Sequence, residues 1–450
     1  MINFLQSRCV YQSLNFFWLI FFITFINSSL ATAETDKANS LPEPLTLGYA
    51  LSLSENDHPD NILARTRLDA AIAEKNHVEG SGGFQTKLEG RLQWGEPVSS
   101  SFGQKNEDHF IGLSASKRLY DFGLSQAEMN SALAKVDTYQ LSLQGTQSQH
   151  RIAIMRAYFN VILSDLAYAR DNEKMAIAFV RFDRIKKRNE LGQVAAVELL
   201  EAENTYHVAR SIRYASDVSR RASRSMLANT LNVPGQLSSV LVRPELIMHK
   251  RKMPDIEQLQ KAALENNYNL KALRKKVDSA RHKVISARAQ KKPLIDLRLQ
   301  AADYSRITRQ SDRYKAGITF EMPLSSSGAI DAEIAKQRSS LVEAQAELRK
   351  AEMQIQQQVL ELSQQIYIVK AQRDESIILS EYRDIALDKS RGLYELDIKS
   401  DLGDSLAFFS EALYKVAKAD FDLTLVWVQL DAIIGKPVSF TVASEDLLKK

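Results

Sequence analysis

Two pairs of carboxylates lie just past sharp breaks between long helical stretches. Asp401 and Asp404 are three residues apart, and Glu198 and Glu201 have the same spacing. Residues three apart share a face of a helix, so each pair presents its two charges together. Such a pair can attract cations, or it can simply cap a helix, since carboxylates favour the amino-terminal end of the helix dipole. The spacing alone leaves both interpretations open.

A basic cluster precedes the first of these breaks. Lys186, Lys187 and Arg188 are consecutive, and Gly192 follows within a few residues. The position of Gly192 is taken by Asp397 at the second break. The basic cluster is either a solvated end of a helix or a contact for a partner protein.

No residue pattern predicts an enzyme, a cofactor or a metal site. No two histidines are four residues apart, none lies in an HExxH pattern, and neither a phosphate-binding loop nor a serine elbow is present. The acidic residues are spread along helices at the spacing of a solvated surface. The histidines are His58, His77, His109, His150, His207, His249 and His282.

Residues 1–33 have the pattern of a secretory signal peptide. Arg8 precedes a largely apolar run from residue 14 to residue 26, and Ala31-Thr32-Ala33 supplies small residues for cleavage. A membrane anchor is the alternative, but this run is too short to span ~30 Å of hydrocarbon as a helix. We therefore expect residues 1–33 to be removed.

The remaining chain would have no cysteine, because Cys9 lies in the signal peptide and is the only one. Disulfides and cysteine ligands are then excluded, and an amino-terminal lipid anchor is not expected. Subtracting Arg8 from the 59 basic residues leaves 58 against 55 acidic ones, a net charge of +3. This near balance argues against nucleic acid as a partner.

The chain repeats itself at a fixed offset. Gly123 to Gly328 is 205 residues, and Gly192 to Asp397 is also 205. Each of the two glycines is followed by 67 helix-compatible residues, 124–190 and 329–395. A constant offset between equivalent breaks indicates an internal duplication, and we place the two structural repeats at residues 34–243 and 244–450. Each long helix would measure roughly 100 Å.

Four segments have the alternation of β-strands, two in each repeat. We place them at about residues 84–94, 109–119, 294–303 and 314–323. Successive side chains of a strand point to opposite faces, so each segment has one mainly apolar face and one polar face. This pattern fits a half-buried sheet of a soluble α+β protein, or membrane strands facing lipid and water. Four strands cannot close a barrel in lipid, so in the second case several chains must combine them.

The long helices carry apolar seams with heptad spacing. The first seam is Ile152, Met155, Phe159, Ile162, Leu166 and Ala169, and the second is Leu341, Ala344, Leu348, Ala351 and Ile355. Heptad spacing predicts packing against a neighbouring antiparallel helix. We expect these neighbours to be returning helices at about residues 195–231 and 401–434.

The mature chain resembles the TolC-type outer-membrane efflux proteins. The resemblance is carried by the opening Leu45-Thr46-Leu47, Ala50-Leu51 and His58-Pro59, by Leu119-Tyr120-Asp121-Phe122-Gly123, by Met322-Pro323-Leu324 with Gly328, and by Glu190-Leu191-Gly192-Gln193-Val194 with residues 197–203. No single motif is highly specific, but their doubled order is.

This resemblance implies a mainly α protein with a membrane β-barrel part. It would have long antiparallel coiled-coil helices and four strands per chain, and a homotrimer would form a 12-stranded barrel and a 12-helix periplasmic tunnel. The channel would lie in the outer-membrane lipid of a Gram-negative bacterium, with a periplasmic extension. It would dock onto a periplasmic adaptor protein and an inner-membrane transporter, for small-molecule efflux or for type I protein secretion.

The second tip departs from the family pattern, since Asp397 stands where the family usually has glycine. In relatives, acidic residues just past this turn can ring the tunnel entrance. A strict alignment places Gly403 and Leu406 there, and Asp401 and Asp404 are displaced by two. We expect Asp401 and Asp404 to form acidic rings at the entrance, with Glu198 and Glu201 as further candidates. Gly192, Asp397, Lys186, Lys187 and Arg188 are the candidate adaptor-docking residues. A soluble periplasmic coiled-coil scaffold is the alternative.

Overall fold

The computed structural model describes residues 41–53, 58–95, 107–236, 239–305, 311–396, 398 and 401–438. The chain divides into Met1–Leu41 and Pro42–Lys450, and all helices and strands below belong to the second unit. The predicted signal peptide, with Cys9, lies outside the described residues and remains a prediction, as does the division into two repeats.

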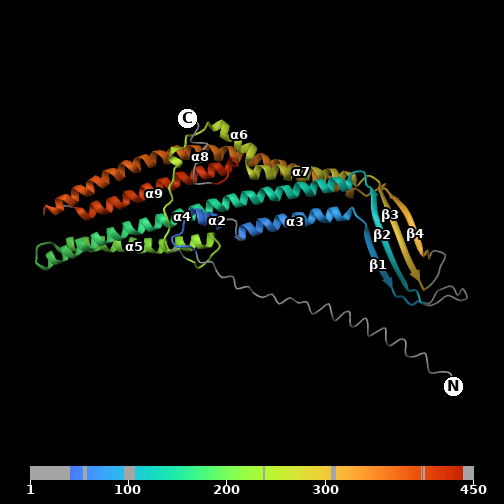
Figure 1. Cartoon of the computed structure of the whole chain (residues 1–450), viewed down its shortest axis with the longest axis horizontal. Helices are drawn as coiled ribbons and strands as arrows, with labels where there is room; N and C mark the ends of the chain where they lie inside the picture. The colour runs from blue at the N-terminus through green and yellow to red at the C-terminus, as the bar shows by residue number, and fades with distance from the viewer. Residues whose placement is uncertain are drawn as a thin grey trace, which may run out of the picture. The chain divides into compact units, whose positions relative to one another are not determined.

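Helices make up most of this unit, and they are interrupted twice by a pair of strands (Figure 1). The first half contains α2 (Leu47–Ser52), α3 (Pro59–Ser81), β1 (Gln85–Arg91), β2 (Phe110–Tyr120), α4 (Leu124–Glu190) and α5 (Ala196–Thr230). The second half contains η2 (Met248–Lys250), α6 (Ile256–Asn266), α7 (Tyr268–Ala289), β3 (Leu294–Tyr304), β4 (Tyr314–Glu321), α8 (Ala329–Glu395) and α9 (Leu402–Ile433).

The two longest helices, α4 and α8, each contain 67 residues and begin in the same way. Gly123 and Gly328 precede them with φ of +96° and +83°, a left-handed conformation that glycine adopts without steric cost. Both helices therefore start from a left-handed glycine in the connection that follows a strand. Their bounds are those expected from the sequence.

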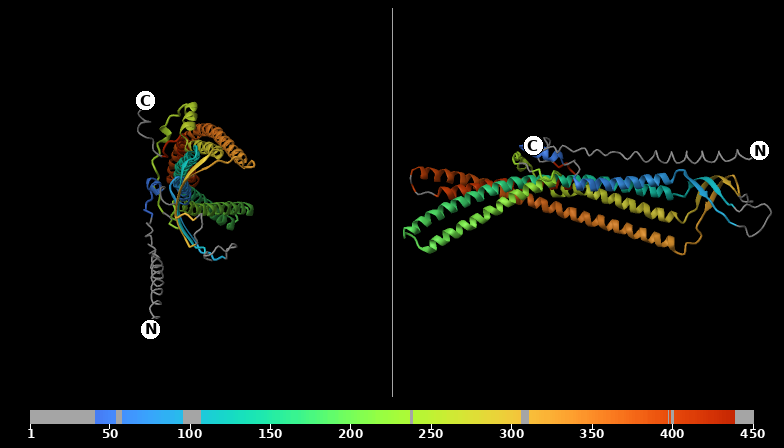
Figure 2. Two further views of the ribbon diagram at one scale, coloured as in Figure 1. Left: turned by 90° about the vertical axis from the view of Figure 1, so that its right-hand side faces the viewer. Right: turned by 90° about the horizontal axis from the view of Figure 1, so that it is seen from below.

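Shorter helices cover the two long ones in succession. In the half next to the strands, α3 and α7 pack against α4, and α7 and α6 pack against α8. In the other half, α5 returns along α4, and α9 returns along α8 and contacts α4 (Figure 1). The sequence-based prediction contains α5 and α9, but it lacks α3, α6 and α7. Figure 2 shows the α4–α5 and α8–α9 hairpins diverging toward their tips.

The predicted seam of α4 lies in the core over most of its length. Ile152, Met155, Phe159 and Ile162 are buried, and Phe159 stacks on Phe421 of α9 with ring centroids 4.4 Å apart. Leu166 is half-buried, but Ala169 is exposed, so the prediction that Ala169 belongs to the seam is wrong. The seam ends there because α4 exchanges its neighbours as the hairpins diverge.

The seam of α8 follows the predicted spacing. Ala344 and Ile355 are buried, and Leu341, Leu348 and Ala351 are half-buried. Among the described helices, α4 is the one with a stretch long and apolar enough to cross a membrane by composition. Because that helix supplies the core contacts above, we regard it as a core helix.

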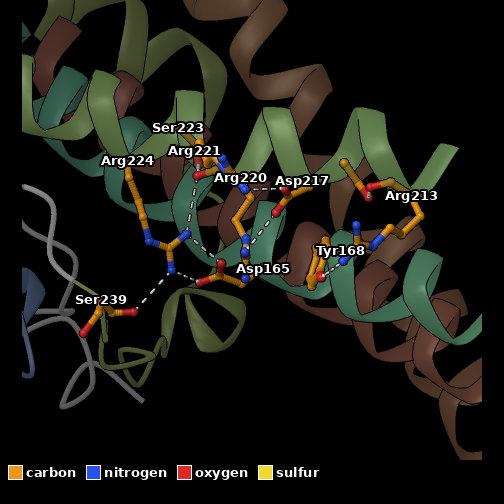
Figure 3. Close-up of polar contacts among 10 residues, drawn as sticks. Asp165, Tyr168, Arg213, Asp217, Arg220, Arg221, Ser223, Arg224 and Ser239 are labelled. Atoms are coloured by element: carbon orange, nitrogen blue, oxygen red, sulfur yellow. Dashed lines mark hydrogen bonds and ion pairs between the residues drawn. The ribbon is translucent and has the colours of Figure 1, made fainter. Parts of the chain in front are cut away.

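Arginines of α5 fasten this helix to α4 (Figure 3). Arg224 makes two hydrogen bonds to the carboxylate of Asp165, of 2.7 and 2.8 Å, and also donates to the carbonyl of Ser239. Arg213 donates to the Tyr168 hydroxyl at 2.6 Å, and Arg220 lies 4.2 Å from the centre of the Tyr168 ring. Paired, bidentate arginine contacts fix orientation as well as distance. They hold the first hairpin together where its apolar seam is thin.

The four strands form one antiparallel sheet in the order β1-β2-β3-β4. The sheet is curved and stands at one end of the helices (Figure 2). β1 is shorter than the predicted 84–94, since the chain leaves the ladder after Arg91 and pairs again only at Trp94 and Glu107. β4 ends at Glu321, two residues before Pro323, which has no N–H to donate to a ladder.

The register places most apolar residues of the four strands on one face, with Phe110, Leu294 and Tyr304 on the other. Leu88 lies opposite Leu113, Leu113 opposite Ala301, and Ala301 opposite Tyr314. This face is not covered by any described helix, and Leu88, Ile318 and Phe320 are 70%, 69% and 64% exposed. A sheet with an uncovered apolar face and two unpaired edges is incomplete as a water-soluble structure.

Candidate functional site at the helix tips

The turn between α4 and α5 forms the first tip. Gly192 has φ of +71°, and the amide of Gln193 donates to the carbonyl of Arg188 at 2.9 Å. This bond satisfies one of the carbonyl groups left open at the end of a helix. Ala195 then precedes α5, so the chain reverses within a few residues and Gly192 lies in the turn between α4 and α5.

The second tip repeats this geometry with the same offset of 205 residues. The amide of Ile398 donates to the carbonyl of Leu393 at 3.0 Å, and these residues correspond to Gln193 and Arg188. Asp397, which corresponds to Gly192, lies outside the described residues. Its proposed role in docking therefore remains a prediction from the sequence.

Asp401 and Asp404 lie at the start of α9 but differ in their surroundings. Asp401 occupies the N-cap position, and its side chain makes no capping hydrogen bond. Asp404 lies in the first turn, and its Oδ2 atom is 2.9 Å from Nη2 of Arg181 on α4. The structure thus places Asp404 in an ion pair within the chain, whereas Asp401 is exposed.

The Arg181–Asp404 pair belongs to a series of contacts between α4 and α9. Arg170 and Lys174 of α4 approach Glu411 of α9 at 3.3 and 3.1 Å. The hydrogen bond from Arg170 to Asp171 raises the pKa of Arg170, and Glu411 adds to this effect. We call Arg170, Lys174, Arg181, Asp404 and Glu411 the α4–α9 ladder. It connects the two diverging hairpins.

The α4–α9 ladder was not predicted from the sequence. Its cations are spaced by four and seven residues on α4, and its carboxylates by seven on α9. This is the spacing of charges that flank a coiled-coil seam. This spacing could therefore have indicated the α4–α9 ladder, but only if α4 and α9 were already known to be neighbours.

An apolar groove lies beside the ladder, between α4, α5 and α9. It has a volume of about 280 Å³ and is lined by Ile177, Ala178, Val208, Ile212, Ala407 and Phe408, with the Arg181–Asp404 pair at its edge.

Glu198 and Glu201 are exposed at the start of α5. Glu198 lies in the first helical turn, where a carboxylate stabilises the positive end of the helix dipole. Within the part of the chain that the structure describes, neither side chain makes an ion pair. The structure does not bring them into contact with Asp401 or Asp404.

The basic cluster lies in the last turns of α4. Lys186, Lys187 and Arg188 are all exposed, and Lys187 pairs with Asp183 at 2.7 Å, one helical turn earlier. The hydrogen bond to Asp183 raises the pKa of Lys187. Cations in the last turn stabilise the negative end of the helix dipole, so the cluster has a structural role in addition to any role in docking.

Three comparisons with known proteins bear on this geometry. Residues 259–385 match the family model described as "Outer membrane efflux protein". No curated protein matches the sequence. The fold matches the Campylobacter jejuni CmeC outer membrane channel with a TM-score of 0.70 and 13% identity, over 90% of this chain and 88% of that chain.

Two further solved structures have the same fold as this chain. The outer membrane protein VceC of Vibrio cholerae has a TM-score of 0.69 and 14% identity, over 87% of this chain and 97% of that chain. The MtrE outer membrane channel of Neisseria gonorrhoeae has a TM-score of 0.69 and 14% identity, over 88% and 91%. At these identities the structures establish the fold.

Proposed function

We propose that this chain is an outer membrane efflux protein of the TolC family and that it forms a homotrimeric channel that conducts substrates from a periplasmic adaptor and an inner-membrane transporter to the exterior. The family match over residues 259–385 and the shared fold support this proposal. The protein would be a passive conduit, and the inner-membrane partner would supply the energy. The cargo would be small molecules in an efflux system or a protein in type I secretion.

The incomplete sheet is the observation that carries this proposal. Its apolar face is uncovered, and β1 and β4 are unpaired at its edges. Backbone groups at such edges cannot be left without partners in hydrocarbon. Three copies supply twelve strands from four each, an even number that can close into a barrel with the apolar faces toward lipid.

The outer faces of α5 and α8 support the same assembly. Each carries a stripe of exposed residues at heptad spacing. The α5 stripe is Val208, Ser211, Ala215, Val218 and Ala222, and the α8 stripe is Ile368, Ala371, Glu375, Ile378, Tyr382 and Ile385. We propose that the α5 stripe of one copy packs against the α8 stripe of the next, which would close a ring of twelve long and returning helices.

The tips would face the adaptor. Gly192 and the basic cluster of Lys186, Lys187 and Arg188 would form the docking end of the first hairpin, because they lie in or next to the turn between α4 and α5. Asp397 is proposed for the second tip from its place in the sequence alone. Asp401, Asp404, Glu198 and Glu201 would line the entrance. Side chains of one sign at a constriction select ions by charge.

Membrane fractionation and gel analysis without boiling test the proposal. We expect the full chain in the outer membrane as a heat-dissociable trimer, and we expect the purified trimer to conduct ions across a planar bilayer. A monomeric, water-soluble species without conductance would instead support a periplasmic coiled-coil scaffold.

A further inference from the structure

The polar face of the sheet can be assigned residue by residue from the strand register. Residues directly opposite each other in antiparallel strands share a face. The row through Arg298 is Gln85, Ser116, Arg298 and Gly317, and the next row toward the hairpin loops is Lys87, Ser114, Gln300 and Lys315. These two rows contain three cations and no carboxylate.

The whole polar face is also basic. Over the described strands it carries five basic side chains against three acidic ones, a net charge of +2 per chain. The basic residues are Lys87, Arg91, Arg118, Arg298 and Lys315, and the acidic residues are Glu89, Asp296 and Glu321. We call Lys87, Arg298 and Lys315 the basic patch.

Ion pairs occur both around the basic patch and within it. Near the helix end of the sheet, Arg118 pairs with Asp296 at 3.3 Å. Lys87 pairs with Glu89 at 2.5 Å and Lys315 with Asp312 at 3.3 Å, and these pairs are exposed. Among the described residues Arg298 makes no ion pair.

Arg298 also has room around it. Its neighbours in the row are Ser116 on β2 and Gly317 on β4, and a side chain built at Gly317 would meet no atom within 4 Å. Adjacent rows are about 6.6–6.8 Å apart along a strand, so a hydrated anion that contacts Arg298 also lies close to the Lys87 and Lys315 side chains.

We propose that the basic patch makes the strand end of the channel a binding region for small anions. This inference rests on the proposed function, in which the polar face lines the lumen. Three copies would place nine cations there. Arginine and lysine residues lining a pore favour anions, and substitutions in the lumen of a barrel change its selectivity.

The two ends of the channel would then prefer ions of opposite charge. The carboxylates proposed at the entrance would favour cations, whereas the basic patch would favour anions. An anion that enters the channel from the adaptor would therefore meet its most favourable electrostatic potential near the exit. Such a gradient of charge concentrates an anionic solute on the strand side.

The test measures the reversal potential of the purified trimer in a planar bilayer under a potassium chloride gradient at low salt. The variant Lys87→Gln, Arg298→Gln, Lys315→Gln removes the basic patch, and we expect it to shift the chloride-to-potassium permeability ratio toward potassium. A change of one kT in the lumen potential corresponds to roughly a sevenfold change in this ratio.

The matched control is Lys117→Gln, which removes one cation from the opposite face of the same sheet. Lys117 lies opposite Leu297 on the apolar face, with its Nζ atom 5.2 Å from the centre of the Phe84 ring. We expect this variant to keep the wild-type ratio. A triple variant that conducts with an unchanged ratio would overturn the inference and leave the proposed function intact.

A second measurement needs no variant. Inorganic tripolyphosphate is added to each side of the wild-type channel in turn, and we expect a voltage-dependent block from the strand side that high salt abolishes. A conducting wild-type channel that is not blocked from either side would refute the basic patch as an anion site. A folded trimer that does not conduct at all would refute the proposed function and this inference with it.

Discussion

At the scale of single residues, Asp404 is the clearest case of a charge whose role depends on its partner. Its ion pair with Arg181 is partly exposed, so it contributes only about 0–1 kcal/mol to stability. The ion pair matters more for electrostatics than for stability. The positive charge of Arg181 cancels most of the negative charge that Asp404 would otherwise present at the tip. Asp401, which lies at the N-cap without such a partner, is the stronger candidate for an acidic entrance.

Removing acidic charges and removing a basic charge at this tip should change the ion selectivity of the channel in opposite directions. Asp401→Asn and Asp404→Asn should each lower the preference of the channel for cations, whereas Arg181→Gln should raise it by freeing the Asp404 carboxylate. Single-channel conductance and reversal potential in a planar bilayer measure both effects. Lys186→Gln, on the basic cluster, is a control outside the ladder. Identical conductance and reversal potential in all three variants would contradict a role of Asp401 and Asp404 in the selectivity of the entrance.

His150 predicts a dependence of stability on pH. Burial lowers the pKa of His150 below the ordinary value of 6.5, the nearby His58 lowers it further, and Asp60 opposes these effects. The His58 and His150 rings lie 4.1 Å apart. Because the folded chain binds this proton less readily than the unfolded chain, stability should fall as the pH drops through and below about 6.5.

The measurement for His150 is the thermal unfolding of the detergent-solubilised protein between pH 7.5 and pH 5. We expect His150→Gln to lose part of the acid sensitivity of the wild type, since the side chain can no longer be protonated. His282→Gln, a histidine of α7 for which no such surroundings exist, serves as the comparison. Equal slopes against pH in His150→Gln and the wild type would contradict the prediction.

The partners of these residues could not be predicted from the sequence. Arg181 and Asp404 are 223 positions apart, and the carboxylate spacing is equally compatible with capping. Which helix lies beside α9 depends on packing over the whole chain. The sequence therefore predicted the candidate carboxylates but not the cation that neutralises one of them.

At the scale of elements, the ends of helices were the most predictable feature. The glycines before α4 and α8 and the turns after them are strong local signals, because a positive φ favours glycine wherever it occurs. α3, α6 and α7 are absent from the prediction, although α7 carries Leu270, Val277 and Val284 at heptad spacing, and all three are buried. Their positions follow from packing against α4 and α8, which no local pattern encodes.

Gly435 and Gly328 make a matched pair for testing the cost of a side chain at a helix end. Both have positive φ, +74° and +83°. A Cβ atom at Gly435 would lie 2.5 Å from the carbonyl oxygen of Asn266 at the end of α6, whereas one at Gly328 would meet nothing within 4 Å. The backbone conformation alone costs roughly 1–2 kcal/mol for alanine.

We therefore expect Gly328→Ala to destabilise the fold by roughly 1–2 kcal/mol and Gly435→Ala by a further ~1–3 kcal/mol, since the clash involves backbone that cannot move aside easily. Urea unfolding followed by helical circular dichroism in detergent gives both values. If the two variants were equally stable, the close approach of the α9 end to α6 would be wrong.

At the scale of the whole molecule, the sheet and the long helices both leave surfaces that other copies of the chain could cover. Among the described residues, the sheet has two unpaired edges and an uncovered, largely apolar face, and α5 and α8 carry the exposed stripes defined above. An isolated chain would expose all of these surfaces to water at a large cost in free energy. The same rotation about one axis can pair the sheet edges and the helix stripes, because both run along the same sides of the chain.

This agreement predicts where a single charge should disrupt the assembly. Val218 on α5 and Ile378 on α8 are 66% and 65% exposed and lie on the two stripes. Val218→Asp or Ile378→Asp would bury an unpaired carboxylate at the contact between copies, which costs several kcal/mol. We expect both variants to fold but to yield monomers in analytical ultracentrifugation in detergent. Gln372→Asp, also exposed on α8 but to the side of its stripe, should remain trimeric. Intact trimers of all three variants would mean that the helices of neighbouring copies meet through other faces.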